Sequence, residues 1–100
     1  MDKYTVKINP KAFRDLDIIF EYIAHEKLSP ENALEQISRI KKAILGLSFF
    51  PQAHQERLEG RFTRKGYRQL LIDNYIIIFR VDENTKTVYV VTIQYYRRLI

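Results

Sequence analysis

Apolar runs alternate with short polar breaks throughout the second half of the chain. Three runs rich in isoleucine, valine, tyrosine and phenylalanine occupy residues 66–72, 75–81 and 87–98. Runs of this kind, bounded by turn-forming residues, predict three consecutive antiparallel strands. Asp73-Asn74 fits a tight two-residue hairpin turn, because both residue types tolerate positive φ.

The polar residues 82–86 predict a longer hairpin loop, in which Asn84 suits a left-handed backbone position. A three-stranded meander this apolar cannot stand alone in water, so one of its faces needs cover. We expect the first half of the chain to supply that cover.

The first half opens with an alternating segment, residues 4–8, which predicts a short strand. Asn9 and Pro10 then favour the start of a helix over residues 10–26, because asparagine is a good helix cap and proline suits the first turn. The predicted buried stripe of this helix contains Phe13, Leu16, Phe20 and Ile23, widened by Ala12 and Ile19. The predicted outward positions are Asp15, Asp17, Glu21 and Glu26.

Ser29-Pro30 repeats the capping pattern and predicts a second helix over residues 30–48. Its predicted buried stripe contains Ala33, Ile37, Ile40, Ile44 and Leu47, flanked by Leu34 and Leu45. The break between the helices covers only residues 27–29, so the two helices are expected to form an antiparallel hairpin.

Pro51 is expected to end the second helix, with Phe49 and Phe50 wedging its end against the sheet. The predicted order is then strand, helix, helix and three strands. We interpret the chain as one α+β domain, residues 1–100, with a four-stranded antiparallel-type sheet and the helical hairpin packed on one face.

Composition narrows the class of protein. The chain has no cysteine, which excludes disulfides and thiolate metal sites and suits a cytoplasmic location. Its start lacks the pattern of a signal peptide, and no run approaches the length of a membrane span. His25 and His54 are far apart, lack a metal-ligand spacing and are expected at the surface, so we predict neither a metal nor a cofactor.

The formal net charge of +5 is unevenly distributed. Residues 1–50 carry eight Lys and Arg against seven Asp and Glu, whereas residues 51–100 carry nine against five. A basic cluster, opposed only by Glu59, contains Arg57, Arg61, Arg64, Lys65 and Arg68. Such a cluster favours an anionic partner, either nucleic acid or an acidic protein, although mild basicity also serves solubility alone.

The polar segment 52–66 is expected to deliver these basic side chains to the open edge of the sheet or to the face opposite the helices. The last predicted strand ends in a second group, Tyr95, Tyr96, Arg97 and Arg98. These residues suit base stacking and phosphate contact, but equally an aromatic strand end with solubilising charges. Arg80 is expected to have a surface or cross-strand role.

An ordered series of short segments resembles the RelE/ParE family of bacterial toxins over nearly the whole chain. The segments are Pro10-Lys11-Ala12, Asp15-Leu16, Ile19, Tyr22-Ile23-Ala24, Leu47-Ser48-Phe49-Phe50-Pro51, Gly66-Tyr67-Arg68, the hairpin of residues 73–82, and Ile93-Gln94-Tyr95-Tyr96-Arg97-Arg98. The resemblance implies the toxin half of a toxin–antitoxin pair, with a small cognate antitoxin as partner.

Two activities share this family's fold, and fold alone does not separate them. RelE-like members cut messenger RNA in the ribosomal decoding site, and ParE-like members poison DNA gyrase. RelE-like nucleases commonly carry cations at the positions of Leu70 and Ile76 in this chain, so the resemblance favours a ParE-like action. If the chain is instead a metal-independent endoribonuclease, the resemblance implies Arg68, Tyr96 and Arg97 as catalytic.

The residues predicted to bind the target are Arg61, Arg64, Lys65, Arg68, Tyr95, Tyr96, Arg97 and Arg98. A third possibility is a non-catalytic module that only binds nucleic acid or protein. Such a module also fits a basic sheet without a recognisable catalytic motif.

Overall fold

The sheet has the strand order β1-β4-β3-β2, so the first and last strands of the sequence are neighbours. The computed structural model describes residues 3–56 and 66–95. Its strands are β1 (Thr5–Ile8), β2 (Tyr67–Ile72), β3 (Tyr75–Asp82) and β4 (Thr87–Tyr95). β2, β3 and β4 form the predicted antiparallel meander.

β1 runs parallel to β4, which makes the sheet mixed and corrects the expectation of an antiparallel-type sheet. A parallel pairing requires a long connection between the strands concerned. Here the helical hairpin and the other two strands separate β1 from β4, so no tight turn constrains their relative direction.

Both hairpin loops are where the sequence predicts them, but one detail differs. Asp73 has a φ of 54°, as the two-residue turn requires. In the longer loop Lys86, and not Asn84, occupies the left-handed region with a φ of 52°. The Asp82 carboxylate accepts the N–H of Asn84 at 3.0 Å, which fixes the start of that loop in another conformation.

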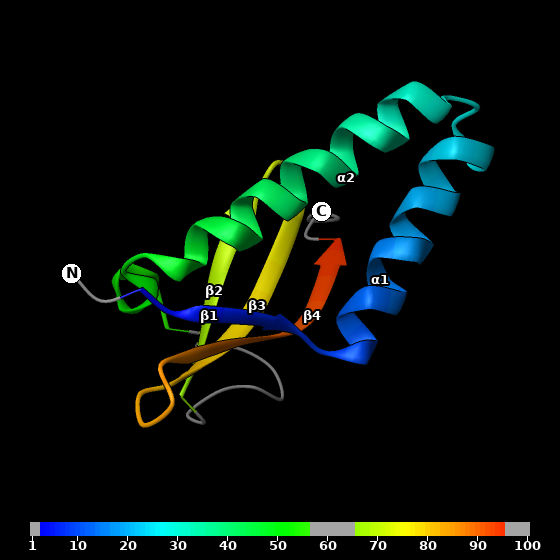
Figure 1. Ribbon diagram of the computed structural model, residues 1–100. Coiled ribbons are helices and arrows are strands. Elements are labelled where there is room, and N and C mark those ends of the chain that lie inside the picture. Colours follow the sequence, from blue (N-terminus) through cyan, green and yellow to red (C-terminus); the bar gives the residue numbers. More distant parts are fainter. Residues whose placement is uncertain (1–2, 57–65, 96–100) are drawn as a thin grey trace.

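The two helices are α1 (Pro10–Glu21) and α2 (Pro30–Leu45). α1 continues as a π-helical turn, Tyr22–Glu26, and α2 as a short 3-10 turn, Gly46–Ser48. Asn9 and Ser29 occupy the predicted N-cap positions, but neither side chain makes a capping hydrogen bond. In Figure 1, α2 crosses the sheet while α1 lies beside β4, and the tip of the hairpin extends beyond the strands.

The core lies between the hairpin and one face of the sheet. α2 buries Ala33, Ile40 and Ile44, and Leu47 follows them in the 3-10 turn, as predicted. The sheet contributes the buried residues Tyr75, Ile77, Phe79, Val88, Val90 and Ile93.

The buried face of α1 differs from the prediction. Ala12, Leu16 and Ile19 are buried, but Asp15 is buried too, and Phe13 is 53% exposed. The face is therefore rotated toward Asp15, because the carboxylate of Asp15 accepts hydrogen bonds from β4.

Phe49 and Phe50 do not wedge the end of α2 against the sheet, since they are 48% and 61% exposed. Phe50 has a φ of 52°, and the chain turns there into a second 3-10 turn, Pro51–Ala53. Pro51 and His54 pack inward instead: Pro51 is fully buried, and His54 packs on Phe79. Within residues 3–56 and 66–95, no helix is both long and apolar enough to span a bilayer.

Candidate functional site

Only two of the eight predicted target-binding residues, Arg68 and Tyr95, fall in the part of the chain that the structure describes. The others lie outside the described residues: Arg61, Arg64, Lys65, Tyr96, Arg97 and Arg98. The two that are described are each at the centre of a distinct group of side chains.

Arg68 lies on β2, the edge strand of the sheet, and is half-buried. It is directly opposite Phe79, whose side chain is in the core under the helices. Residues opposite each other in an antiparallel pair point to the same face. Arg68 is therefore on the helix-bearing face of the sheet and not on the opposite one.

The guanidinium of Arg68 donates a hydrogen bond from Nη1 to the backbone carbonyl of His54, at 2.8 Å. The backbone nearby is also paired, since Gln69 donates its N–H to the carbonyl of Gln55 at 2.8 Å and Glu56 forms a bridge with Arg68. A guanidinium has five N–H groups, so Arg68 keeps donors that can bind a phosphate or carboxylate.

His54 is a half-buried residue and not the plain surface residue that was predicted. Its ring packs edge-on against Phe79, with the ring centroids 5.7 Å apart. Burial, and secondarily the positive charge of Arg68, lowers the pKa of His54. The neutral imidazole of His54 thus lies beside the guanidinium of Arg68 at the sheet edge. No local sequence pattern predicted this combination.

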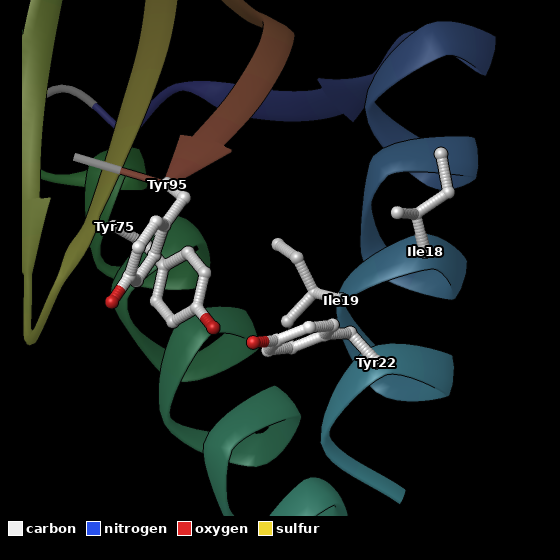
Figure 2. A pocket seen from close by; sticks show the side chains of 5 residues that line it. All are labelled: Ile18, Ile19, Tyr22, Tyr75 and Tyr95. Atoms are coloured by element: carbon white, nitrogen blue, oxygen red, sulfur yellow. The ribbon is translucent and has the colours of Figure 1, made fainter. Parts of the chain in front are cut away.

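Tyr95 lines an apolar pocket of about 380 Å³ between α1 and the end of the sheet. The other lining residues are Ile18, Ile19, Tyr22 and Tyr75. Figure 2 shows Ile19 of α1 and Tyr22 of the adjoining π-helical turn reaching toward the two tyrosines of the sheet. A hollow with this lining can admit an apolar side chain of another molecule.

The tyrosine rings of the pocket are close to one another. Tyr75 and Tyr95 are directly opposite on β3 and β4, with ring centroids 5.4 Å apart. Burial, followed by the neighbouring Tyr95, Tyr22 and Asp73, raises the pKa of Tyr75. The Tyr75 phenol is thus a neutral hydrogen-bonding group beside an apolar hollow. Neither Tyr22 nor Tyr75 was among the residues predicted to bind the target.

Arg68 and Tyr95 do not belong to one site. Their partners on β3, Phe79 and Tyr75, are four residues apart, which is about 13 Å along an extended strand. Both side chains are on the helix-bearing face, but at opposite ends of it.

Two further predictions can be compared with the geometry. The guanidinium carbon of Arg80 lies 4.3 Å from the ring centroid of Tyr89, its cross-strand partner, which confirms the cross-strand role. His25 is exposed and pairs with Glu21 at 3.0 Å. Among the described residues, no group of three His, Asp or Glu side chains is arranged to hold a metal ion.

The groups around Arg68 and Tyr95 are both carried by a helical hairpin over a four-stranded mixed sheet of order β1-β4-β3-β2. Residues 6–100 match the sequence profile described as "ParE toxin of type II toxin-antitoxin system, parDE". The chain therefore belongs to the ParE toxin family.

Solved structures of toxin–antitoxin systems share the fold. The chain is similar to one in the chromosomal ParDE system of P. aeruginosa, with a TM-score of 0.76 and 23% identity over 95% of this chain and 98% of that one. It is similar to one in the RelBE2 complex of Mycobacterium tuberculosis, with a TM-score of 0.66 and 21% identity over 93% and 98%.

A third similar structure is the intact E. coli RelBE complex, with a TM-score of 0.60 and 14% identity over 95% of this chain and 99% of that one. A comparison with curated protein sequences finds no match. At these identities the structural similarities establish the fold.

Proposed function

We propose that this member of the ParE family inhibits bacterial growth by acting on DNA gyrase and thereby on replication. The observation that carries the proposal concerns the two positions where RelE-like nucleases commonly have cations. In this chain Leu70 packs against the core and Ile76 is 1% exposed. Apolar side chains in these packed positions cannot stabilise the charge of a phosphoryl transition state.

We further propose that a small cognate antitoxin binds the chain and neutralises it. The similar structures from P. aeruginosa, M. tuberculosis and E. coli are described as toxin–antitoxin systems or complexes. The pocket lined by Tyr22, Tyr75 and Tyr95 gives an antitoxin an apolar hollow to fill.

Induced expression in a bacterium tests the target. We expect filamentous cells and a DNA-damage response, with bulk messenger RNA intact, and inhibition of supercoiling when purified protein is added to gyrase. Primer extension on a reporter message during the first minutes of induction should show no new ends. Cuts within translated codons, lost on Arg68→Lys or Tyr96→Phe, would instead identify a ribosome-dependent nuclease.

The basic cluster is expected to be needed for toxicity, because positive charge steers the protein to gyrase or its DNA. Replacing Arg64, Lys65 and Arg68 together by alanine should relieve growth inhibition at an unchanged protein level. The matched control replaces three exposed cations of the first half of the chain by alanine: Lys3, Lys7 and Arg14. Equal relief of growth inhibition by the two triple variants would show that net charge, and not the cluster, matters.

A further inference from the structure

α2 carries a second apolar stripe beside the one that faces the core. Leu34 and Leu45 are 63% and 67% exposed, although the helix buries its other large aliphatic residues at least in part. Between them is a hollow of about 360 Å³ on the outer side of the helix. Its lining residues, named here the α2 flank, are Leu34, Ile37, Ser38, Lys41, Lys42 and Leu45.

The spacing of the α2 flank makes it a continuous surface. Positions three, four, seven, eight and eleven residues after Leu34 follow one side of a helix for three turns. At a rise of about 1.5 Å per residue, Leu34 and Leu45 are about 16 Å apart along the axis. A partner helix of three to four turns matches that length.

Charge selects the kind of partner. Lys41 and Lys42 are exposed at the hollow, and within the described residues neither has an ion-pair partner. A second copy of this chain would gather four ammonium groups along one seam, which like-charge repulsion disfavours. An acidic segment gains charge pairs at the rim and buries the two leucines in the same step.

We propose that the α2 flank binds an acidic amphipathic helix of the antitoxin, with its apolar side chains between Leu34 and Leu45 and its carboxylates on Lys41 and Lys42. This inference rests on the proposed antitoxin partnership and names a second surface, besides the tyrosine pocket, that serves it. It is independent of gyrase as the target. The pocket beside Tyr95 opens elsewhere, between α1 and the sheet, so the two surfaces can be tested separately.

Binding of the candidate antitoxin, a small acidic protein sought in the reading frame adjacent to this gene, provides the first test. Leu34→Ala combined with Leu45→Ala should raise the Kd at least tenfold, because the two side chains are the apolar anchors. Lys41→Glu combined with Lys42→Glu should also raise the Kd at least tenfold, and by less at high salt. Leu71→Ala and Lys7→Glu, which alter exposed residues of the sheet, should change the Kd less than twofold.

The absence of cysteine permits a second, direct test. A Ser38→Cys variant places the chain's one thiol in the hollow, and a Lys7→Cys variant places it on β1 as a control. In the complex, alkylation of the thiol at position 38 should be at least tenfold slower than in the free protein, while alkylation at position 7 is unchanged.

The two tests distinguish antitoxin binding at the α2 flank from binding elsewhere, from no binding and from self-association. Wild-type Kd values for both double variants, or equal alkylation at position 38 in free and bound protein, overturn the inference while antitoxin binding stands. No binding of the antitoxin by wild-type protein overturns both the inference and the partnership. A free protein that is dimeric, and becomes monomeric on Leu34→Ala and Leu45→Ala, would assign the α2 flank to a second copy and also overturn the inference.

Discussion

Asp15 takes the place of a missing strand partner. β1 pairs with β4 only as far as Ile8 and Val90, so the edge of β4 beyond Val90 is not paired with a strand. The backbone N–H of Ile93 lies on that stretch and donates to Oδ2 of Asp15 at 3.0 Å. One carboxylate from α1 thus satisfies a buried edge donor that would otherwise cost free energy.

Two side chains complete the surroundings of the Asp15 carboxylate. Thr92 donates from Oγ1 at 2.6 Å and Lys11 from Nζ at 2.8 Å. Burial by itself raises the pKa of Asp15, but the hydrogen bonds from Lys11, Thr92 and Ile93 outweigh it and hold the pKa below its ordinary value. The ionised form is therefore the one that stabilises the fold.

Asp15→Asn should lower the free energy of unfolding at pH 7 by roughly 1.5–3 kcal/mol, the range for hydrogen bonds to a charged group. A lowered folded-state pKa gives stability that is present above the unfolded pKa of about 3.9 and is lost as the pH falls through the folded value. The difference from wild type should thus shrink below about pH 4. Urea unfolding at pH 7 and pH 3 measures it, with the exposed Asp17→Asn as control. A difference that is the same at both pH values would contradict the role of the charge.

His54 is expected to titrate below the value of about 6.5 of a free histidine side chain. Arg68→Gln should raise the pKa of His54 only part of the way back, because burial is the larger cause and remains. Since the pKa is lowered on folding, His54 contributes stability above about pH 6.5 that is lost as the pH falls. Titration of the imidazole C–H signals by NMR measures the pKa of His54 in the wild type and in the Arg68→Gln variant. A pKa for His54 that Arg68→Gln leaves unchanged would rule out the influence of the guanidinium.

At the scale of the element, α2 has two apolar stripes with different roles. Ile40 is fully buried against the sheet, whereas Leu45 is largely exposed on the flank. Ile40→Ala should lower the free energy of unfolding by about 2–5 kcal/mol, the range for removing a large buried side chain. Leu45→Ala should change it by less than about 0.5 kcal/mol. Thermal or urea unfolding of the two variants measures this contrast, and similar losses would contradict the assignment of the stripes.

β4 contains an irregularity that decides where its last residues point. Ile78 pairs with Thr92 and Phe79 with Val90, so one residue, Val91, is extra on β4. An extra residue shifts the alternation of side chains by one. Ile93 therefore joins Val90 in the core, and Tyr95, two residues on, lines the pocket under α1.

The described residues share one core, to which both helices and all four strands contribute buried or partly buried residues. We therefore expect a single unfolding transition, with the same midpoint from far-UV circular dichroism and from tyrosine fluorescence. The chain has seven tyrosines and no tryptophan, so the fluorescence reports on the tyrosines alone. Separate midpoints would mean that the hairpin, whose tip extends beyond the sheet (Figure 1), melts independently.

Much of the architecture followed from the sequence because it depends on neighbours along the chain. Apolar residues that recur every second position predicted the strands, and apolar residues that recur every 3.6 positions predicted the helices, in the correct order. The spacing of four residues between Ile40 and Ile44 predicted the buried face of α2. The turn at Asp73 followed from its residue type. The resemblance of short ordered segments identified the superfamily, which the ParE family match over residues 6–100 confirms.

Only the tertiary structure decided which distant segments meet. Asp15 and Ile93 are 78 positions apart, and no local sequence pattern predicts that a carboxylate on α1 binds the edge of β4. Contacts between distant segments also decide three other features. They are the parallel pairing of β1, the extra residue at Val91 and the face that Arg68 occupies. Each depends on strand pairing and packing between segments far apart in sequence, whereas periodicity records only how a segment repeats along itself.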